Sequence, residues 1–104
     1  MTKISRKTPI ITLIKSDLVD KLWSTLVSLK NVEEMEDFAE GLFTYTEIGM
    51  LAKRLEIAKM LLSGHAYFEI QDRLKVTNRT ITSVQRRLLR NDGFRQIIEK
   101  LINE

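Results

Sequence analysis

The sequence contains no cysteine, one proline, four glycines and a single histidine among its 104 residues. Without cysteine, disulfide bonds and thiolate metal ligands are excluded. The one histidine, His65, is too little material for a zinc centre or a histidine-dependent catalytic triad, and we interpret it as an exposed turn residue. The low content of proline and glycine argues against a loop-rich β sandwich or a flexible linker.

Long hydrophobic runs are also absent. No apolar run approaches the roughly 18 residues that a membrane span requires. The basic N-terminus lacks the apolar core and the cleavage site of a signal peptide. A length of 104 residues, with 43% apolar and 30% charged residues, is typical of one globular domain. These properties predict a soluble, cytoplasmic domain.

Charge is distributed unevenly along the chain. The net charge of +3 combines +4 over residues 1–16, −5 over residues 17–40 and +4 over residues 64–90. We interpret residues 1–12 as a basic, flexible N-terminal arm and residues 13–104 as a single helical domain. The acidic group within residues 33–37 is interpreted as a solvated surface, because its spacing does not bring three carboxylates together as a metal site would need. Two basic segments would attract a polyanion to particular surfaces.

Apolar spacing of three and four residues predicts about six helices and an all-α fold. Asn31 is a predicted N-cap, and Thr44 and Glu47 have the spacing of a capping box. The helix that starts there carries two apolar stripes, so a second layer, or a second subunit, is expected to cover it. Gly64 is expected to end this helix. Trp23 is predicted to be buried, and Asp92 to cap the last helix.

Residues 66–90 predict a helix-turn-helix. Ala66 to Leu74 forms the first helix, with Ala66, Ile70 and Leu74 inward, and Thr77 caps a second helix over about 78–90. In this motif the second helix enters the major groove of DNA. The inward positions of the second helix are Ile81, Val84 and Leu88. Its outward residues suit base edges and phosphates, and they are Asn78, Arg79, Thr82, Gln85 and Arg86.

From residue 43 to about 90 the chain resembles the Trp repressor superfamily, and within it the Trp-repressor-related (YerC/YecD-like) subgroup, which residues 22–38 also resemble. The residues that carry the resemblance are Phe43-Thr44-Tyr45-Thr46-Glu47, Leu51-Ala52-Lys53-Arg54-Leu55-Glu56-Ile57, Leu61-Leu62-Ser63-Gly64, Ile70, Leu74 and Thr77-Asn78-Arg79-Thr80-Ile81-Thr82. The resemblance implies an intertwined homodimer with two helix-turn-helix heads that bind double-stranded DNA.

The resemblance also implies which residues contact ligands. DNA contacts fall on Tyr67 and Gln71 of the first helix and on Asn78, Arg79, Thr80 and Thr82 of the second; we add Thr77, Ser83, Arg86 and Arg87 from the same segment. Of the three side chains that hold tryptophan in the tryptophan-responsive repressor, only Arg54 is matched, and Ser83 and Arg87 stand at the other two positions. We therefore expect an unknown effector, if any, and not tryptophan. Arg54 is equally compatible with capping a helix or pairing with an acidic residue.

Two classes of function stay open. The first is a sequence-specific DNA-binding transcriptional regulator, with repression the favoured mode. The alternative is a helical dimerisation or protein-interaction module that has lost DNA binding. The absence of acidic residues from 78–87 favours the first class, because a helix-turn-helix that no longer binds DNA should have lost this excess of basic over acidic residues. An enzyme, a cofactor and a metal are not expected, since paired carboxylates, a phosphate-binding glycine loop and a histidine-based nucleophile are missing.

Overall fold

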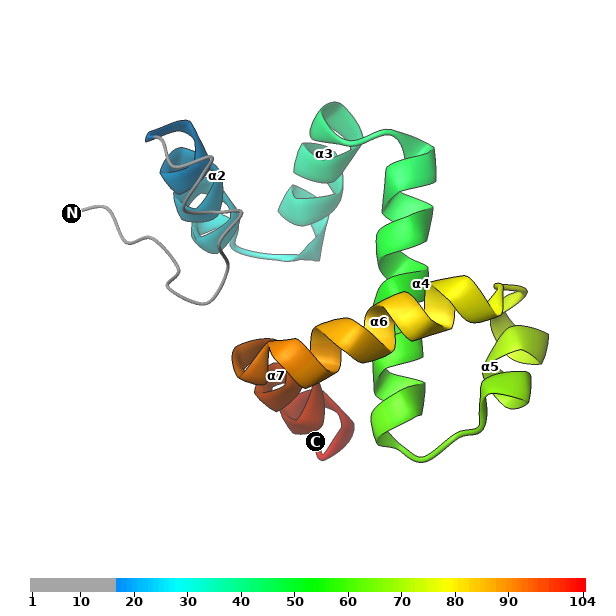
Figure 1. Cartoon of the computed structure of the whole chain (residues 1–104). Helices are drawn as coiled ribbons and strands as arrows, with labels where there is room; N and C mark the ends of the chain where they lie inside the picture. Colours follow the sequence, from blue (N-terminus) through cyan, green and yellow to red (C-terminus); the bar gives the residue numbers. More distant parts are fainter. Residues whose placement is uncertain (1–16) are drawn as a thin grey trace. The chain divides into compact units, whose positions relative to one another are not determined.

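The computed structural model describes residues 17–104, and every regular element in this range is a helix (Figure 1). The helices are α2 (Asp17–Ser28), α3 (Val32–Leu42), α4 (Tyr45–Leu62), α5 (Tyr67–Leu74), α6 (Asn78–Arg90) and α7 (Asp92–Ile102). The prediction of an all-α fold with about six helices is confirmed. The predicted arm at residues 1–12 lies outside the described residues. None of the described helices is both long and apolar enough to cross a membrane.

The chain divides between Thr44 and Tyr45 into two compact units. Of the first unit the structure describes α2 and α3. Asn31 caps α3 as predicted, because its side-chain oxygen accepts a hydrogen bond from the Glu34 backbone N–H at 2.9 Å. The Glu34 carboxylate in turn accepts from the Lys30 backbone N–H at 2.9 Å. Two backbone N–H groups at this helix start are thereby satisfied.

The helices of the first unit have apolar faces, yet neither α2 nor α3 contains a buried residue. Trp23 is 44% exposed and Val27 is 85% exposed. The prediction that Trp23 is buried is therefore wrong for the single chain. The apolar periodicity predicted these helices correctly and identifies which face of each is apolar. It does not identify the surface against which that face packs.

The core lies in the second unit, where α4 contacts α5, α6 and α7 and where α6 contacts α5 and α7. Its fully buried side chains have at most 2% of their surface exposed. They are Ile57, Ala58 and Met60 of α4, Ile70 of α5, Ile81, Val84 and Leu88 of α6, and Ile98 of α7. This core fixes α5 and α6 against the longer α4.

The central helix α4 is buried only toward its C-terminal end. Its three core residues lie between Ile57 and Met60, whereas Met50, Leu51 and Leu55, which precede them, are 44 to 49% exposed. The helix ends at Gly64, which has a φ of 91°. There the Gly64 N–H donates to the Leu61 carbonyl at 3.1 Å and the His65 N–H donates to the Met60 carbonyl at 3.0 Å. This pair of bonds is a Schellman motif, so the predicted stop at Gly64 is confirmed.

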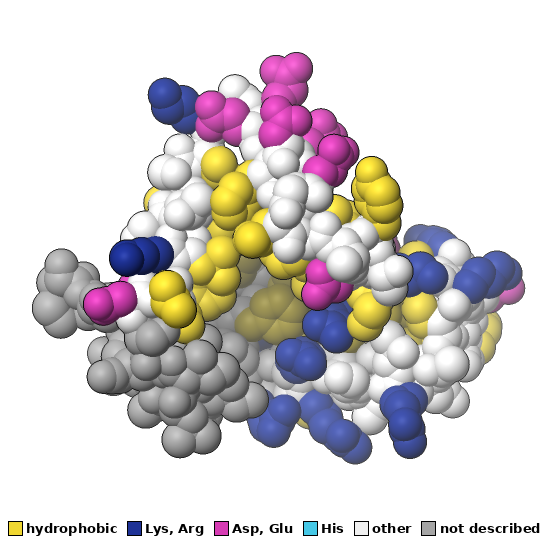
Figure 2. Space-filling model, turned by 90° about the horizontal axis from the view of Figure 1, so that it is seen from above, with side chains coloured by type: hydrophobic (Ala, Val, Ile, Leu, Met, Phe, Trp, Pro, Cys, Tyr) yellow, Lys and Arg dark blue, Asp and Glu magenta, His cyan; other side chains and the backbone are white. Residues whose placement is uncertain are grey.

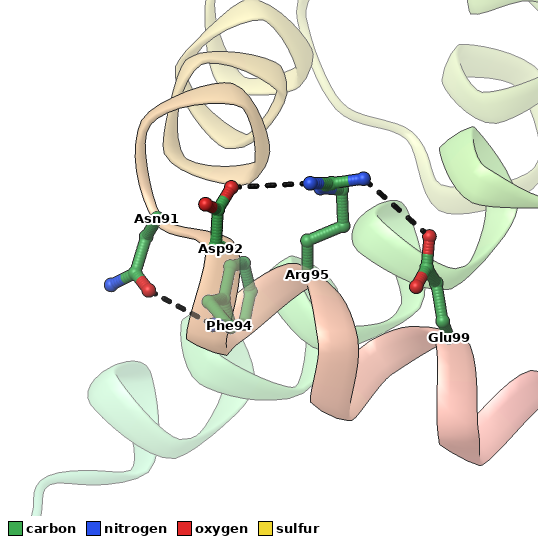
Figure 3. A network of polar contacts seen from close by, with 5 residues as sticks. All are labelled: Asn91, Asp92, Phe94, Arg95 and Glu99. Atoms are coloured by element: carbon green, nitrogen blue, oxygen red, sulfur yellow. Dashed lines mark hydrogen bonds and ion pairs between the residues drawn. The ribbon is translucent and has the colours of Figure 1, made fainter.

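The start of α7 corrects one expectation (Figure 3). Asn91, not Asp92, is the N-cap, because its side-chain oxygen accepts the Phe94 backbone N–H at 2.9 Å. Asp92 is the first residue of the helix and pairs with Arg95 at 3.1 Å. Arg95 also lies 3.7 Å from Glu99. Asn and Asp cap about equally well, so composition alone does not distinguish two adjacent candidates.

Candidate nucleic-acid interface

The two helices of the predicted helix-turn-helix, α5 and α6, are joined by Lys75, Val76 and Thr77. Lys75 has a left-handed backbone with a φ of 56°, and its N–H donates to the Gln71 carbonyl at 2.8 Å. Left-handed backbone costs about 1–2 kcal/mol for a residue other than glycine. Val76 packs against the core and holds the turn in place. A connection of this length and the two helix ranges agree with the sequence prediction.

The start of α5 is held by a carboxylate. Glu69 accepts the Ala66 backbone N–H at 2.8 Å, and its same oxygen lies 3.5 Å from Nδ1 of His65. The hydrogen bond from Ala66 lowers the pKa of Glu69 from its ordinary value of 4.5; desolvation opposes this shift, and His65 and Arg73 add to it. Ala66 itself is exposed at the N-cap position, so the expectation that it faces inward is wrong. Ile70 is buried and Leu74 packs against the core, as expected.

The start of α6 is held by two threonines. The Thr77 hydroxyl oxygen accepts the Thr80 backbone N–H at 3.3 Å, which confirms Thr77 as the N-cap. The two hydroxyl oxygens lie 3.2 Å apart. Asn78 and Arg79, between them, are exposed. The helix therefore begins rigidly, with two polar side chains free to contact a ligand at its first turn.

The body of α6 has a buried apolar side and an exposed side that carries its arginines. Ile81, Val84 and Leu88 are buried, as predicted. The helix contains no acidic residue, and four arginines lie exposed along it. None of the four makes an ion pair with any described residue. These arginines are Arg79, Arg86, Arg87 and Arg90.

Two cations of the second unit that lie outside α6 are partly neutralised by acidic neighbours. Lys75 lies 3.8 Å from Asp72, and Arg95 is placed between two carboxylates. Figure 2 shows several Lys and Arg side chains near one another along the lower edge of the view. A row of guanidinium groups that make no ion pair with described residues attracts phosphate and suits bidentate hydrogen bonding.

The remaining predicted residues differ in their access to a ligand. Tyr67 packs against the core, and Phe68 beside it is 71% exposed. The side chains of Gln71, Thr80, Thr82 and Ser83 are half-buried. The sequence prediction left out Arg90, although its spacing from Arg79 and Arg86 was visible. Arg90 is the last residue of α6, four positions after Arg86, so it lies on the same side of the helix.

Arg54 lies apart from these residues, on α4. Its side chain is half-buried and makes no ion pair within the described residues. A metal centre has no basis in the described range, because no group of three or more His, Asp or Glu side chains there could hold an ion. The ten predicted DNA-contacting residues thus occupy α5, α6 and the turn between them, whereas the candidate effector residue lies on a different helix.

Comparison with known proteins agrees with this arrangement. The family model described as "Trp repressor protein" matches residues 17–102. The chain is 36% identical over 84 residues to the uncharacterized protein YerC of Bacillus subtilis, covering 80% of this chain and 81% of that protein. A TrpR-like protein from Eubacterium eligens superposes with a TM-score of 0.81 at 35% identity, covering 86% of this chain and 94% of the other. A candidate Trp repressor from Staphylococcus aureus superposes with a TM-score of 0.83 at 32% identity, covering 90% and 95%.

Proposed function

The chain belongs to the Trp repressor family, a family of regulators and not of enzymes, and on this premise we propose that it binds specific sequences of double-stranded DNA through α5 and α6. One observation carries the proposal. The exposed side of α6 holds four arginines that make no ion pair with the described residues, and the helix contains no acid. A module that had lost DNA binding would have no reason to keep this combination.

The chemistry of the exposed residues supports sequence recognition as well as attraction. Arginine donates two parallel hydrogen bonds to guanine, and asparagine can pair with adenine in the same bidentate way. Arg79 and Asn78 both lie exposed at the capped start of α6. Arg86 and Arg87 further along the helix would neutralise phosphates and release counterions. Tyr67, Gln71, Thr77, Thr80, Thr82 and Ser83 complete the proposed contact surface.

We further propose that the regulator acts as a homodimer and as a repressor in the cytoplasm. The exposed apolar side chains support a dimer: α2 and α3 bury none of their residues, and Met50, Leu51 and Leu55 of α4 are partly exposed. A second copy would cover such faces in a symmetric assembly. Two heads would then bind half-sites about one helical turn apart, and occupancy of such a site would block transcription.

Selection of bound duplexes from a random DNA pool tests the proposal. We expect one enriched palindromic site, bound with an affinity that falls steeply as salt rises. Arg79→Ala should reduce affinity for that site by about 1–3 kcal/mol and relax the preference at one base position. Arg95→Ala is the matched control, because Arg95 is already neutralised by Asp92 and Glu99. If no duplex is enriched even at low salt, the protein-interaction module is the correct function.

A further inference from the structure

Three of the α6 arginines share one line along the helix. Arg79, Arg86 and Arg90 are separated by seven and then four positions. At 3.6 residues per turn, such residues lie within about 20° of a common line on the helix surface. This arginine line, defined as Arg79, Arg86 and Arg90, lies opposite the buried side chains of Ile81, Val84 and Leu88. Arg87 lies about 100° away from its neighbour Arg86 and so stands off the line.

The arginine line is longer than a groove is wide. With a rise of 1.5 Å per residue, Arg86 lies about 10 Å and Arg90 about 16 Å along the helix from Arg79. The major groove of B-DNA is about 12 Å wide. If the N-terminal end of α6 points into the groove, so that its first turn contacts the base edges, the far end of the line extends toward the wall of the groove, where the phosphates are.

Building on the proposed function, we propose that the arginine line divides its work by position: Arg79 contacts base edges, and Arg86 and Arg90 hold the phosphates of the groove wall. Arg90 is thereby a DNA-contacting residue in its own right. Its exposure and its lack of an ion pair with described residues leave its guanidinium ready for a phosphate. Three cations on one straight line also set the tilt of α6 in the groove, since each must reach its own target.

A purely structural role for Arg90 makes a different prediction. Arg87 and Arg90 lie in the last turn of α6, where a positive charge stabilises the helix by interacting with the negative end of the helix dipole. If that were the whole role of Arg90, its removal would lower the stability of the fold and leave the number of phosphate contacts unchanged. The salt dependence of DNA binding separates the two roles, because it counts phosphates neutralised by the protein.

The experiment compares full-length variants on the selected duplex by fluorescence anisotropy from low to moderate salt. The expected result for Arg90→Gln and Arg86→Gln is a plot of log affinity against log salt that is shallower by about 0.9 for each phosphate that the variant no longer neutralises. Their affinities should fall equally for the selected and for scrambled duplexes. Arg79→Ala should instead change the ratio between those two duplexes. Arg90→Lys should retain the wild-type slope, and Arg95→Gln is the control on a neutralised arginine.

Each outcome has a definite meaning. Failure of the wild-type protein to bind any selected duplex overturns the proposed function itself. Wild-type binding combined with an unchanged slope in Arg90→Gln overturns the inference alone. Thermal unfolding of the same variant is measured in parallel: a lower midpoint with an unchanged slope assigns Arg90 to the helix dipole and rejects the phosphate contact.

Discussion

The hydroxyl oxygens of Thr77 and Thr80 lie 3.2 Å apart at the first turn of α6, and the Thr77 oxygen also accepts the Thr80 backbone N–H. The two side chains are thus close enough to hydrogen-bond to each other, at the end of the helix that is proposed to contact DNA. This local bonding holds Asn78 and Arg79 on a rigid first turn. A first turn that is already ordered in the free protein loses less conformational entropy when it binds DNA.

The first prediction concerns this cap. Thr77→Ala should lower the free energy of unfolding by about 1 kcal/mol, because the Thr80 N–H loses its partner. Thr77→Ser keeps the oxygen and should lose much less. Urea denaturation at fixed protein concentration measures both. The cap is misassigned if Thr77→Ser proves as unstable as Thr77→Ala.

The second prediction compares Gly64, which follows the end of α4, with Gly49, which lies inside α4. An added Cβ would meet nothing within 4 Å at either Gly64 or Gly49, so only the backbone distinguishes them. Gly64→Ala should destabilise by about 1 kcal/mol, since its φ of 91° is strained for alanine. Gly49→Ala, inside the helix, should stabilise by about 0.5–1 kcal/mol. Thermal unfolding of the two variants should therefore shift in opposite directions. A destabilising Gly49→Ala would contradict the prediction.

The third prediction concerns pH. The pKa of Glu69 is lowered, chiefly by the Ala66 N–H, so the folded state holds this proton less tightly than the unfolded state does. Its contribution to stability is present above the unfolded pKa and is lost as pH falls through the lower, folded pKa. Carbon-detected NMR titration should place the Glu69 midpoint below 4.5. Glu69→Gln should remove this part of the acid dependence of stability, and an unshifted midpoint would contradict the argument.

The local signals in the sequence predicted most of this fold. The N-caps at Asn31 and Thr77, the stop at Gly64 and the buried side of α6 all follow from interactions within a few residues, and all are found. The left-handed Lys75 had no such signal, because tertiary packing of the turn imposes a conformation that lysine does not favour.

Burial was harder to predict than helix position. Trp23 belongs to an apolar face, but a face becomes buried only where another surface covers it. The candidate site shows the same division. Periodicity indicated which side of α6 faces outward, whereas the exposed fraction of each side chain on that side depends on how α4, α5 and α7 pack against the helix.

The fourth prediction is that the protein unfolds as a dimer. Leu51 and Leu55 are large apolar side chains that lie partly open on α4, and a second copy should cover them. The midpoint of thermal unfolding should then rise with protein concentration. Leu55→Glu should produce monomers or prevent folding, whereas Arg95→Glu should leave the assembly intact. Light scattering that gives a monomer mass for the wild-type protein at micromolar concentration would contradict the dimer.

The last prediction is that free tryptophan is not the effector. The resemblance to the tryptophan-responsive repressor implies three ligand-holding positions, of which Arg54 matches one, and Ser83 and Arg87 stand at the other two. The missing second arginine removes a charge-assisted contact worth roughly 1.5–3 kcal/mol. Arg87 makes no ion pair with described residues, so its charge would oppose the ammonium group of the amino acid. Together these changes should weaken tryptophan by about a hundredfold or more, since each 1.4 kcal/mol is about a factor of ten. Calorimetric titration should show no micromolar binding to the wild-type protein, and the double variant Ser83→Arg with Arg87→Ser should bind more tightly. Micromolar binding by the wild-type chain, with DNA affinity rising alongside, would show that its own residues form a tryptophan site of a different design.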